Sequence, residues 1–145
     1  MMITPRSGTS RRFQELGRQQ CYELLATQEV GRVAWQAADA LQILPVTYAL
    51  FEGAIYFRTS PHSIVSELAR PTEVAFEVDE LDQERRTGWS VVVHGRSASV
   101  VPPENLSQRW ELESLMPWAA GLRTLLVRVV PFGISGRLLR RYVDM

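Results

Sequence analysis

The sequence contains no lysine, so all sixteen of its basic residues are arginines. Schiff-base chemistry and a lysine nucleophile are therefore excluded. Cys21 is the single cysteine, which excludes an intramolecular disulfide and a cluster of thiolate metal ligands within one chain. We expect Cys21 to be a small buried hydrophobic residue on an amphipathic helix.

Recognisable catalytic and metal-binding motifs are also missing. The patterns GxGxxG, GxxxxGK[ST], HExxH, CxxC and GxSxG do not occur. The two histidines, His62 and His94, lie far apart in the sequence, which argues against a metal site. We expect His62 to be exposed and His94 to be a satisfied residue of an apolar strand. If the protein is an enzyme, its side chains alone do not explain the reaction, which favours a bound cofactor.

Long hydrophobic runs and an excess of one charge are absent too. No run approaches the length of a membrane span, and the N-terminus lacks the apolar segment of a signal peptide, so we expect a cytoplasmic location. Acidic and basic residues balance at sixteen each, which gives no support for attraction to nucleic acid or a membrane. The arginines near the C-terminus, Arg137, Arg140 and Arg141, are interpreted as a solvated face rather than a phosphate site.

The length and hydrophobic content fit one domain with a real core. We expect residues 1–10 to be a flexible lead-in and residues 11–145 a single domain. Periodicity predicts helices from residue 11 to about 27, from 61 to 70 and from 104 to 116. It predicts strands at residues 30–37, 41–50, 55–57, 73–79, 88–101 and 122–130, with a solvated loop at 80–87, a bulge at Gly95 and a break at 133–136. Six strands with short connections close naturally into a small antiparallel barrel with helices on its outside.

The stretch with the most chemistry, residues 53–68, reads as a strand, a loop and a helix. Arg58 supplies a permanent cation at the end of the strand, and Thr59 and Ser60 supply hydroxyls. Ser60 is a suitable N-cap and Pro61 a suitable first helical residue. This combination predicts a cradle for a phosphate. The alternative is an ordinary capped helix after a strand, with Arg58 solvated or paired with a carboxylate.

Four segments in order carry a resemblance to a known family: CYELLATQEVGRVAW, LPVTYALFEGAIYFRTSPHS, VAFEVDELDQERRTGWSVVVHGR and PWAAGLRTLLVRVVPFGISGR. They cover nearly the whole chain from Cys21 to Arg137. In these segments the chain resembles the pyridoxamine 5'-phosphate oxidase-like family of FMN-binding split barrels. The resemblance implies a mainly β fold, a six-stranded antiparallel split β-barrel with peripheral helices that forms a homodimer with FMN at the subunit interface.

Positions of the cofactor site follow from the same resemblance. It implies that the backbone of Pro45, Val46 and Thr47 lies along the flavin ring. It also implies that Arg58 and Thr59 hold the FMN phosphate, with Ser63 nearby. Two further residues, Trp89 and Ser90, would reach in from the other subunit, where an indole can pack on the flavin.

Ile64 departs from the family pattern. Relatives of this kind often place a lysine at the corresponding position, as a second cation for the phosphate. One cation fewer predicts a weaker hold on the phosphate. Two alternatives would compensate: Arg58 and the helix N-terminus suffice, or an arginine of the partner subunit substitutes.

The resemblance implies an FMN-dependent oxidoreductase that transfers two electrons to or from a small molecule. The alternatives are a non-catalytic protein that binds or senses flavin or haem, and a deazaflavin-dependent reductase. We assign no catalytic acid or base; Tyr48 and His94 are the titrating side chains worth testing, and both are expected to be structural. The chain is shorter than the oxidases that make pyridoxal phosphate and lacks their C-terminal Arg-x-His arrangement.

Overall fold

The structure is a computed structural model that describes residues 9–100 and 125–143 of the 145-residue chain. In chain order the elements are β1 (Thr9–Leu16), α1 (Arg18–Leu25), β2 (Val30–Gln36), β3 (Leu41–Phe51), β4 (Ala54–Thr59), the 3-10 helix η1 (Ile64–Ala69), β5 (Thr72–Asp82), β6 (Thr87–Ser99) and β7 (Leu125–Val143). The predicted strands in the middle of the chain are therefore confirmed, with longer bounds for β4 and β5. The predicted helix at residues 104–116 and the first eight residues of the predicted lead-in lie outside the described residues.

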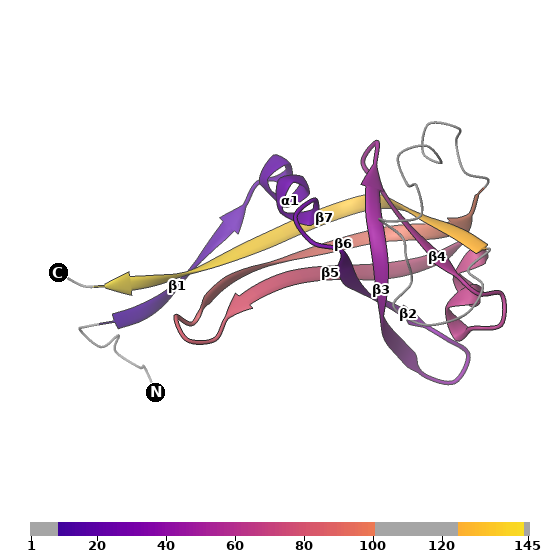
Figure 1. The fold of residues 1–145 in the computed structure, drawn as a ribbon, viewed down its shortest axis with the longest axis horizontal. Helices are drawn as coiled ribbons and strands as arrows, with labels where there is room; N and C mark the ends of the chain where they lie inside the picture. Colours follow the sequence, from indigo (N-terminus) through magenta and orange to yellow (C-terminus); the bar gives the residue numbers. More distant parts are fainter. Residues whose placement is uncertain (1–8, 101–124, 144–145) are drawn as a thin grey trace.

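Six of the strands form a closed ring in the order β7-β4-β3-β2-β5-β6, because β6 also pairs with β7 (Figure 1). All of these pairs are antiparallel. Strand β1 adds a seventh strand outside the ring, by pairing with the C-terminal half of β7 from Leu16↔Gly136 to Thr9↔Val143. The expected split barrel with a mainly β fold is confirmed, with β1 as an addition to its six ring strands.

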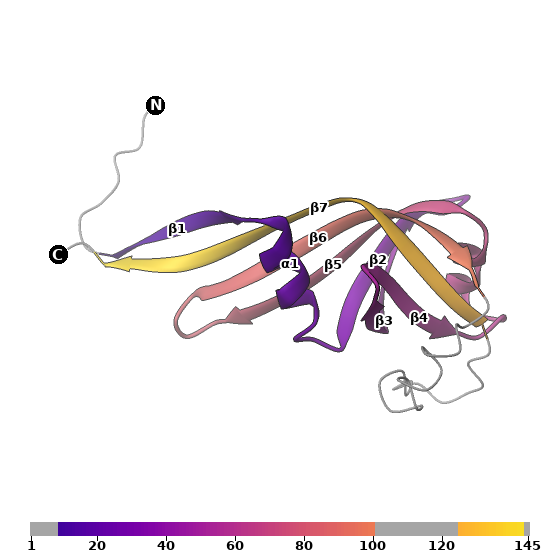
Figure 2. The same cartoon turned by 90° about the horizontal axis from the view of Figure 1, so that it is seen from above.

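The molecule is elongated, with the ring at one end and a flat arm at the other. The β5–β6 hairpin and the paired β1 and β7 run out of the ring together, as the two perpendicular views show (Figure 2). The arm exists because β7 is long enough to pair with β4 at its start and with β1 at its end along the same edge. Among the described residues, no helix is long and apolar enough to cross a membrane.

Helix α1 packs on β7 between the part of that strand bonded to β4 and the part bonded to β1. Cys21 and Leu25 are its buried residues, which confirms the expected hydrophobic role of Cys21, and burial raises the pKa of the Cys21 thiol. The approach of the helix is close: a Cβ atom on Gly136 of β7 would lie 2.7 Å from the Cys21 sulfur. The Tyr48 hydroxyl of β3 donates to the Leu25 carbonyl and so joins the end of the helix to the barrel.

The core fills the ring, and a second cluster lies on the outside of β4. Alternate residues of the strands point inward, among them the fully buried Ile55, Phe57 and Phe76. The other face of β4 is buried as well, since Ala54 and Tyr56 belong to a second cluster with Phe51 and Leu126. Burial on both faces explains why the sequence of β4 begins with a continuous apolar run.

Two sequence-based predictions are wrong at the ends of the chain. Residues 11–16 form strand β1 and not the first turns of a helix, which begins only after Gly17. The apolar spacing of Phe13 and Leu16 suits a helix, but pairing with β7 supplies the backbone hydrogen bonds instead. Residues 133–136 do not break the last strand, because β6 pairs with β7 throughout this segment and into the basic residues that follow.

Two other predictions concern the β5–β6 hairpin. The expected solvated loop at residues 80–87 is shorter than predicted, since β5 continues to Asp82 and β6 starts at Thr87. The bulge expected at Gly95 is confirmed by a register shift between His94 and Gly95. Gly95 lies opposite Pro131 of β7, and a bulge is one of the few places in a sheet where a proline is accommodated.

Candidate functional site

Polar groups gather where β4 ends and the chain turns toward η1. The hydroxyl oxygens of Thr59 and Ser63 lie 2.7 Å apart. Thr59 is 3% exposed, whereas Ser63 is half-buried. Because one hydroxyl donates to the other in this contact, the hydrogen of the accepting hydroxyl stays available for a ligand. The pair therefore offers one oriented hydroxyl donor at the end of β4.

The turn between Thr59 and η1 corrects the predicted capped helix. The His62 amide donates to the Ser60 hydroxyl at 3.2 Å, and the Ser63 amide donates to the Ser60 carbonyl at 3.1 Å. Ser60 therefore stabilises a turn, and the helix that follows is a six-residue 3-10 helix with Ser63 as its N-cap. The short segment before Pro71 leaves no room for a longer helix, since Arg70 is already extended. Donors for a phosphate at this place are side chains rather than an α-helix N-terminus.

Arg58 is the cation of this region. It is half-buried on the outer face of β4, next to the buried Thr59. Within residues 9–100 and 125–143, its guanidinium forms no hydrogen bond or ion pair. The alternative of a carboxylate partner for Arg58 is thus not found there, and five N–H donors remain for a ligand.

The backbone of Pro45, Val46 and Thr47 lies beside this cation. The β3–β4 ladder ends at Tyr48↔Phe57, so Thr47 and Arg58 are the next residues on the two strands. Residues 45–47 pair with β2 along one edge, while the register with β4 no longer includes them along the other. The Tyr48 amide donates to the Glu29 carbonyl on the β2 side, so the Thr47 amide points to the opposite, open edge. Pro45 has no amide hydrogen to lose there.

The remaining predicted site residues are placed differently. Ile64 is 43% exposed at the start of η1, close to Ser63. Trp89 is 9% exposed and packs within the barrel core of its own chain, whereas Ser90 lies on the outer face of β6. Both lie near the start of β6, about 23–26 Å along the strand from Ser97. Ser97 pairs with Val129 of β7, which in turn pairs with β4. A second subunit is needed to bring them to Arg58, and their role stays a prediction.

Two titrating side chains considered from the sequence have clear positions. Tyr48 is 3% exposed, and burial raises the pKa of its phenol; it is structural, as expected. His94 is exposed on the outer face of β6 opposite Ala75, so the expectation of a packed barrel histidine is wrong. The residue before the bulge points outward, which the apolar neighbourhood of His94 in the sequence did not reveal.

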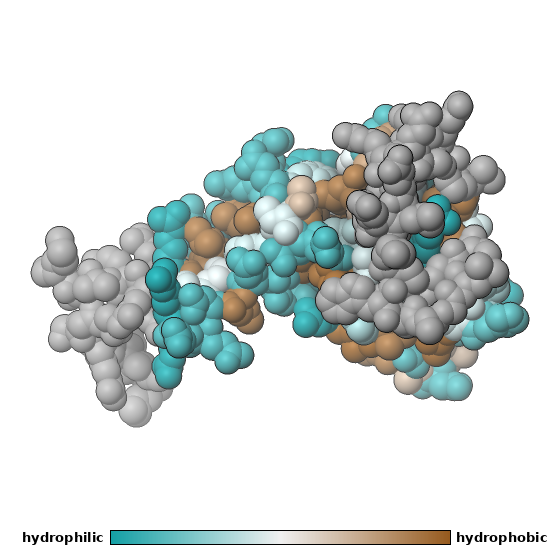
Figure 3. All heavy atoms as spheres, viewed as in Figure 1, coloured by the Kyte–Doolittle hydropathy of each residue, from teal (hydrophilic) through white to brown (hydrophobic). Residues whose placement is uncertain are grey.

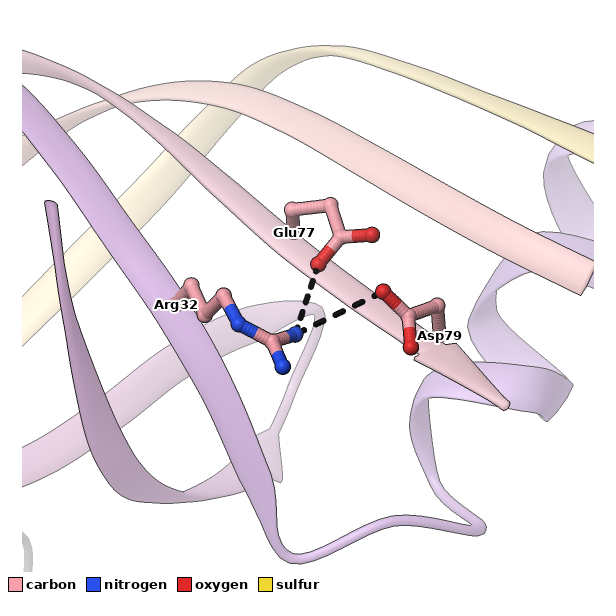
Figure 4. A network of polar contacts seen from close by, with 3 residues as sticks. All are labelled: Arg32, Glu77 and Asp79. Atoms are coloured by element: carbon pink, nitrogen blue, oxygen red, sulfur yellow. Dashed lines mark hydrogen bonds and ion pairs between the residues drawn. The ribbon is translucent and has the colours of Figure 1, made fainter. Parts of the chain in front are cut away.

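A charged cluster on the outer face of β2 and β5 was missed by the sequence analysis. One nitrogen of the Arg32 guanidinium lies 3.3 Å from a Glu77 oxygen and 3.4 Å from an Asp79 oxygen (Figure 4). Burial, together with a hydrogen bond and the negative charge from Asp79, raises the pKa of Glu77 to about 7, against the opposing effect of Arg32. The i, i+2 spacing of the two acids was the available signal, because it places them on one face of a strand. Arg32 lies directly opposite Pro45 on the edge of β3 that pairs with β2, so this cluster lies across β3 from the open edge.

Comparison with known proteins places the chain in a family. The family model for pyridoxamine 5'-phosphate oxidase matches residues 17–138. The chain belongs to the pyridoxamine 5'-phosphate oxidase family. It is also 35% identical over 133 residues to the uncharacterized protein Rv0080 of Mycobacterium tuberculosis. This match covers 88% of this chain and 86% of that protein.

Solved structures show the same fold. The FAD binding protein from Mycobacterium smegmatis has 28% sequence identity and a TM-score of 0.70, over 88% of this chain and 98% of that chain. A FAD-binding protein from Mesorhizobium loti has a TM-score of 0.71 at 22% identity, over 90% of this chain and 98% of that chain. Both structures share the barrel fold of this chain.

The residues present fit the phosphate end of a flavin nucleotide. Arg58 is a cation without a partner in the described part of the chain, and the Thr59–Ser63 hydroxyl pair lies next to it. The open edge at Thr47 supplies a backbone donor for a planar polar ring. These are kinds of contact that a flavin phosphate and ring require. The structure places them at the same end of β4, with Arg58 on the outer face of the strand and the buried Thr59 on the inner face.

Proposed function

We propose that the protein is a homodimeric flavin-dependent oxidoreductase that binds FMN and acts on a small molecule. The observation that carries this proposal is the unpartnered Arg58 guanidinium beside the Thr59–Ser63 hydroxyl pair, directly past the end of the β3–β4 ladder. A bound flavin supplies two-electron transfer, which the side chains of this chain do not provide.

The chain's own residues bind and orient the cofactor in this proposal. Arg58 neutralises the phosphate and can donate two parallel hydrogen bonds to its oxygens. The accepting hydroxyl of the Thr59–Ser63 pair donates its hydrogen to the same group. The Thr47 amide meets the polar edge of the ring, and Pro45 leaves that edge open by lacking an amide hydrogen. The small-molecule substrate would then meet the exposed side of the ring.

The proposed dimer has a candidate surface on the outer face of β3. Leu41 and Ile43 are 76% and 62% exposed, and with Pro45 they follow one face of the strand at every second position. Hydrophobic residues gather over the β2–β3 hairpin in the space-filling view (Figure 3). An apolar stripe of this kind next to the proposed ring position favours burial by a second subunit.

A flavin titration followed by absorption spectroscopy tests this function. We expect the purified protein to retain about one FMN per subunit after removal of excess cofactor. Arg58→Ala should weaken FMN binding about 10- to 100-fold, because a charged hydrogen bond to the phosphate is lost. Arg85→Ala is the matched control, since it removes an exposed arginine from the β5–β6 turn. Unchanged affinity in Arg58→Ala, or a protein that binds no flavin, would contradict the proposal.

A flavin-binding protein without turnover is the second candidate, favoured by the absence of a lysine at position 64 and of any assigned acid or base at the site. Single-turnover reduction of the FMN-loaded protein by a nicotinamide, followed by oxidation with a nitro compound, separates the two. Electron transfer at a useful rate supports the enzyme. Tighter binding of a deazaflavin than of FMN would instead identify a deazaflavin-dependent reductase.

A further inference from the structure

Arg128 of β7 lies on the same outer surface as Arg58. In the β4–β7 register, Tyr56 pairs with Arg128 and Arg58 pairs with Leu126. Tyr56 and Leu126 both belong to the outer cluster, so the residues paired with them face outward too. Arg58 and Arg128 are therefore diagonal neighbours on adjacent strands, with Cα atoms about 7–8 Å apart. Two arginine side chains at this spacing can reach one ligand.

Arg128 carries an unsatisfied buried donor. Its Nε atom is buried and has no hydrogen-bond partner among the described residues. Neither Arg128 nor Arg58 forms an ion pair with a carboxylate in residues 9–100 and 125–143. A buried guanidinium N–H without an acceptor is costly, and two neighbouring cations repel each other. A single anion between them would relieve both costs.

The anion that this pair fits is a phosphate. A guanidinium offers a planar fork of donors that matches phosphate oxygens, and two such groups can bind different oxygens of one phosphate. The Thr59–Ser63 hydroxyl pair lies at the same end of β4. Ile64, at the start of η1, contributes no charge.

We propose that Arg128 is the second cation that binds the phosphate of the flavin nucleotide, together with Arg58. This inference rests on the proposed function. It places the missing positive charge on β7 of the same chain, so that neither a lysine at position 64 nor an arginine of a partner subunit is required. Arg128 is a cofactor-binding residue in this proposal, and it has no part in the chemistry at the ring.

The test compares FMN with riboflavin, which has the same ring and no phosphate. Dissociation constants are measured by quenching of flavin fluorescence for the full-length protein. The ratio of the riboflavin constant to the FMN constant reports the contribution of the phosphate alone. We expect Arg128→Gln to lower this ratio about 10- to 100-fold with little change in the riboflavin constant. Arg85→Gln, on an exposed turn, should leave the ratio unchanged.

Restoring a cation by another route strengthens the test. The double variant Arg128→Gln/Ile64→Lys should recover part of the lost ratio, because a lysine next to Ser63 can reach the same phosphate. An unchanged ratio in Arg128→Gln, in a wild-type protein that prefers FMN, overturns the role of Arg128 and leaves the proposed function intact. A wild-type protein that binds neither flavin overturns both proposals.

If Arg128→Gln does not fold, a variant with a titratable cation at position 128 tests whether this residue binds the phosphate. In Arg128→His the charge at position 128 is present at pH 5.5 and absent at pH 8. In the wild type the phosphate loses negative charge as the pH falls, which lowers the ratio. The ratio of Arg128→His divided by that of the wild type should therefore rise as the pH falls, because only the variant gains a cation. A ratio with the wild-type pH dependence would overturn the proposal.

Discussion

Glu77 couples protonation to the stability of the barrel. Its pKa is raised from 4.5 to about 7 by burial and by Asp79, so the folded protein keeps a proton that the unfolded chain releases. Because the folded state binds more protons between these two values, the free energy of unfolding falls as the pH rises from about 4.5 to 7. Within residues 9–100 and 125–143, Arg32 is the one cation that contacts the pair of negative charges formed by Glu77 and Asp79 above pH 7.

Glu77→Gln should remove this pH dependence. The neutral amide cannot release a proton, so we expect the variant to gain stability relative to the wild type as the pH rises from 5 to 8. Urea unfolding at four pH values in this window measures the effect. Glu73→Gln is the matched control, since Glu73 is an exposed acid on the same face of the same strand. A wild-type curve that is flat or rises between pH 5 and 7 would contradict the assignment.

At the level of elements, the contact between α1 and β7 depends on one glycine of β7, Gly136. Gly136 allows the helix to approach, because the Cys21 sulfur and a Leu16 methyl group occupy the space that a Cβ atom would need. Strand β1 and helix α1 are both attached to β7 at this point. A change at one glycine should therefore affect two elements.

Gly136→Ala should destabilise the protein by about 1–3 kcal/mol, the usual cost of overpacking. The new methyl group would lie 2.7 Å from the Cys21 sulfur and 3.3 Å from the Ser90 carbonyl oxygen. Urea unfolding gives the measurement, and Gly133→Ala is the control, because its Cβ atom would have its nearest neighbour at 4.0 Å. Removing the sulfur with Cys21→Ala in the same chain should recover part of the loss. Equal stability of the two glycine variants would argue against the close contact.

At the level of the whole molecule, the proposed assembly depends on a surface that one chain leaves exposed. Ile43 lies opposite Ala34 of β2, two pairs beyond Pro45, in the middle of the apolar stripe of β3. A dimer that covers this stripe would also bring a second chain next to the open edge at Thr47. The cofactor site and the dimer would then form together.

Ile43→Asp should convert the proposed dimer to a monomer and reduce FMN binding with it. A carboxylate buried in an apolar interface is costly, so we expect the dimer to weaken by at least tenfold. Sedimentation velocity measures the oligomeric state. Leu81→Asp is the control, because Leu81 is 64% exposed on the β5–β6 hairpin, away from the stripe. A wild-type protein that sediments as a monomer would contradict the proposed assembly.

Local sequence determined the positions of most strands. The alternation of apolar and polar residues and the residues that favour turns are both signals that extend over only a few neighbouring positions. The apolar runs of β2, β3, β4 and β6 lie where periodicity predicts them, and Gly95 marks the bulge. The β3–β4 turn uses Glu52 and Gly53 with positive φ, a local requirement that glycine signals. The resemblance to a family added the expectation of a closed split barrel and of a cofactor site around Pro45 and Arg58.

Only the tertiary structure decided features that depend on pairing between distant segments. Residues 11–16 became a strand because β7 offers them a partner, and residues 133–136 stayed in a strand for the same reason. The position of Arg128 beside Arg58 follows from the β4–β7 register, and the contact of Arg32 with Glu77 and Asp79 from the pairing of β2 with β5. Register between strands far apart in the chain depends on the closure of the whole sheet. A local pattern therefore identifies the strands, and the closed ring determines which of their side chains meet.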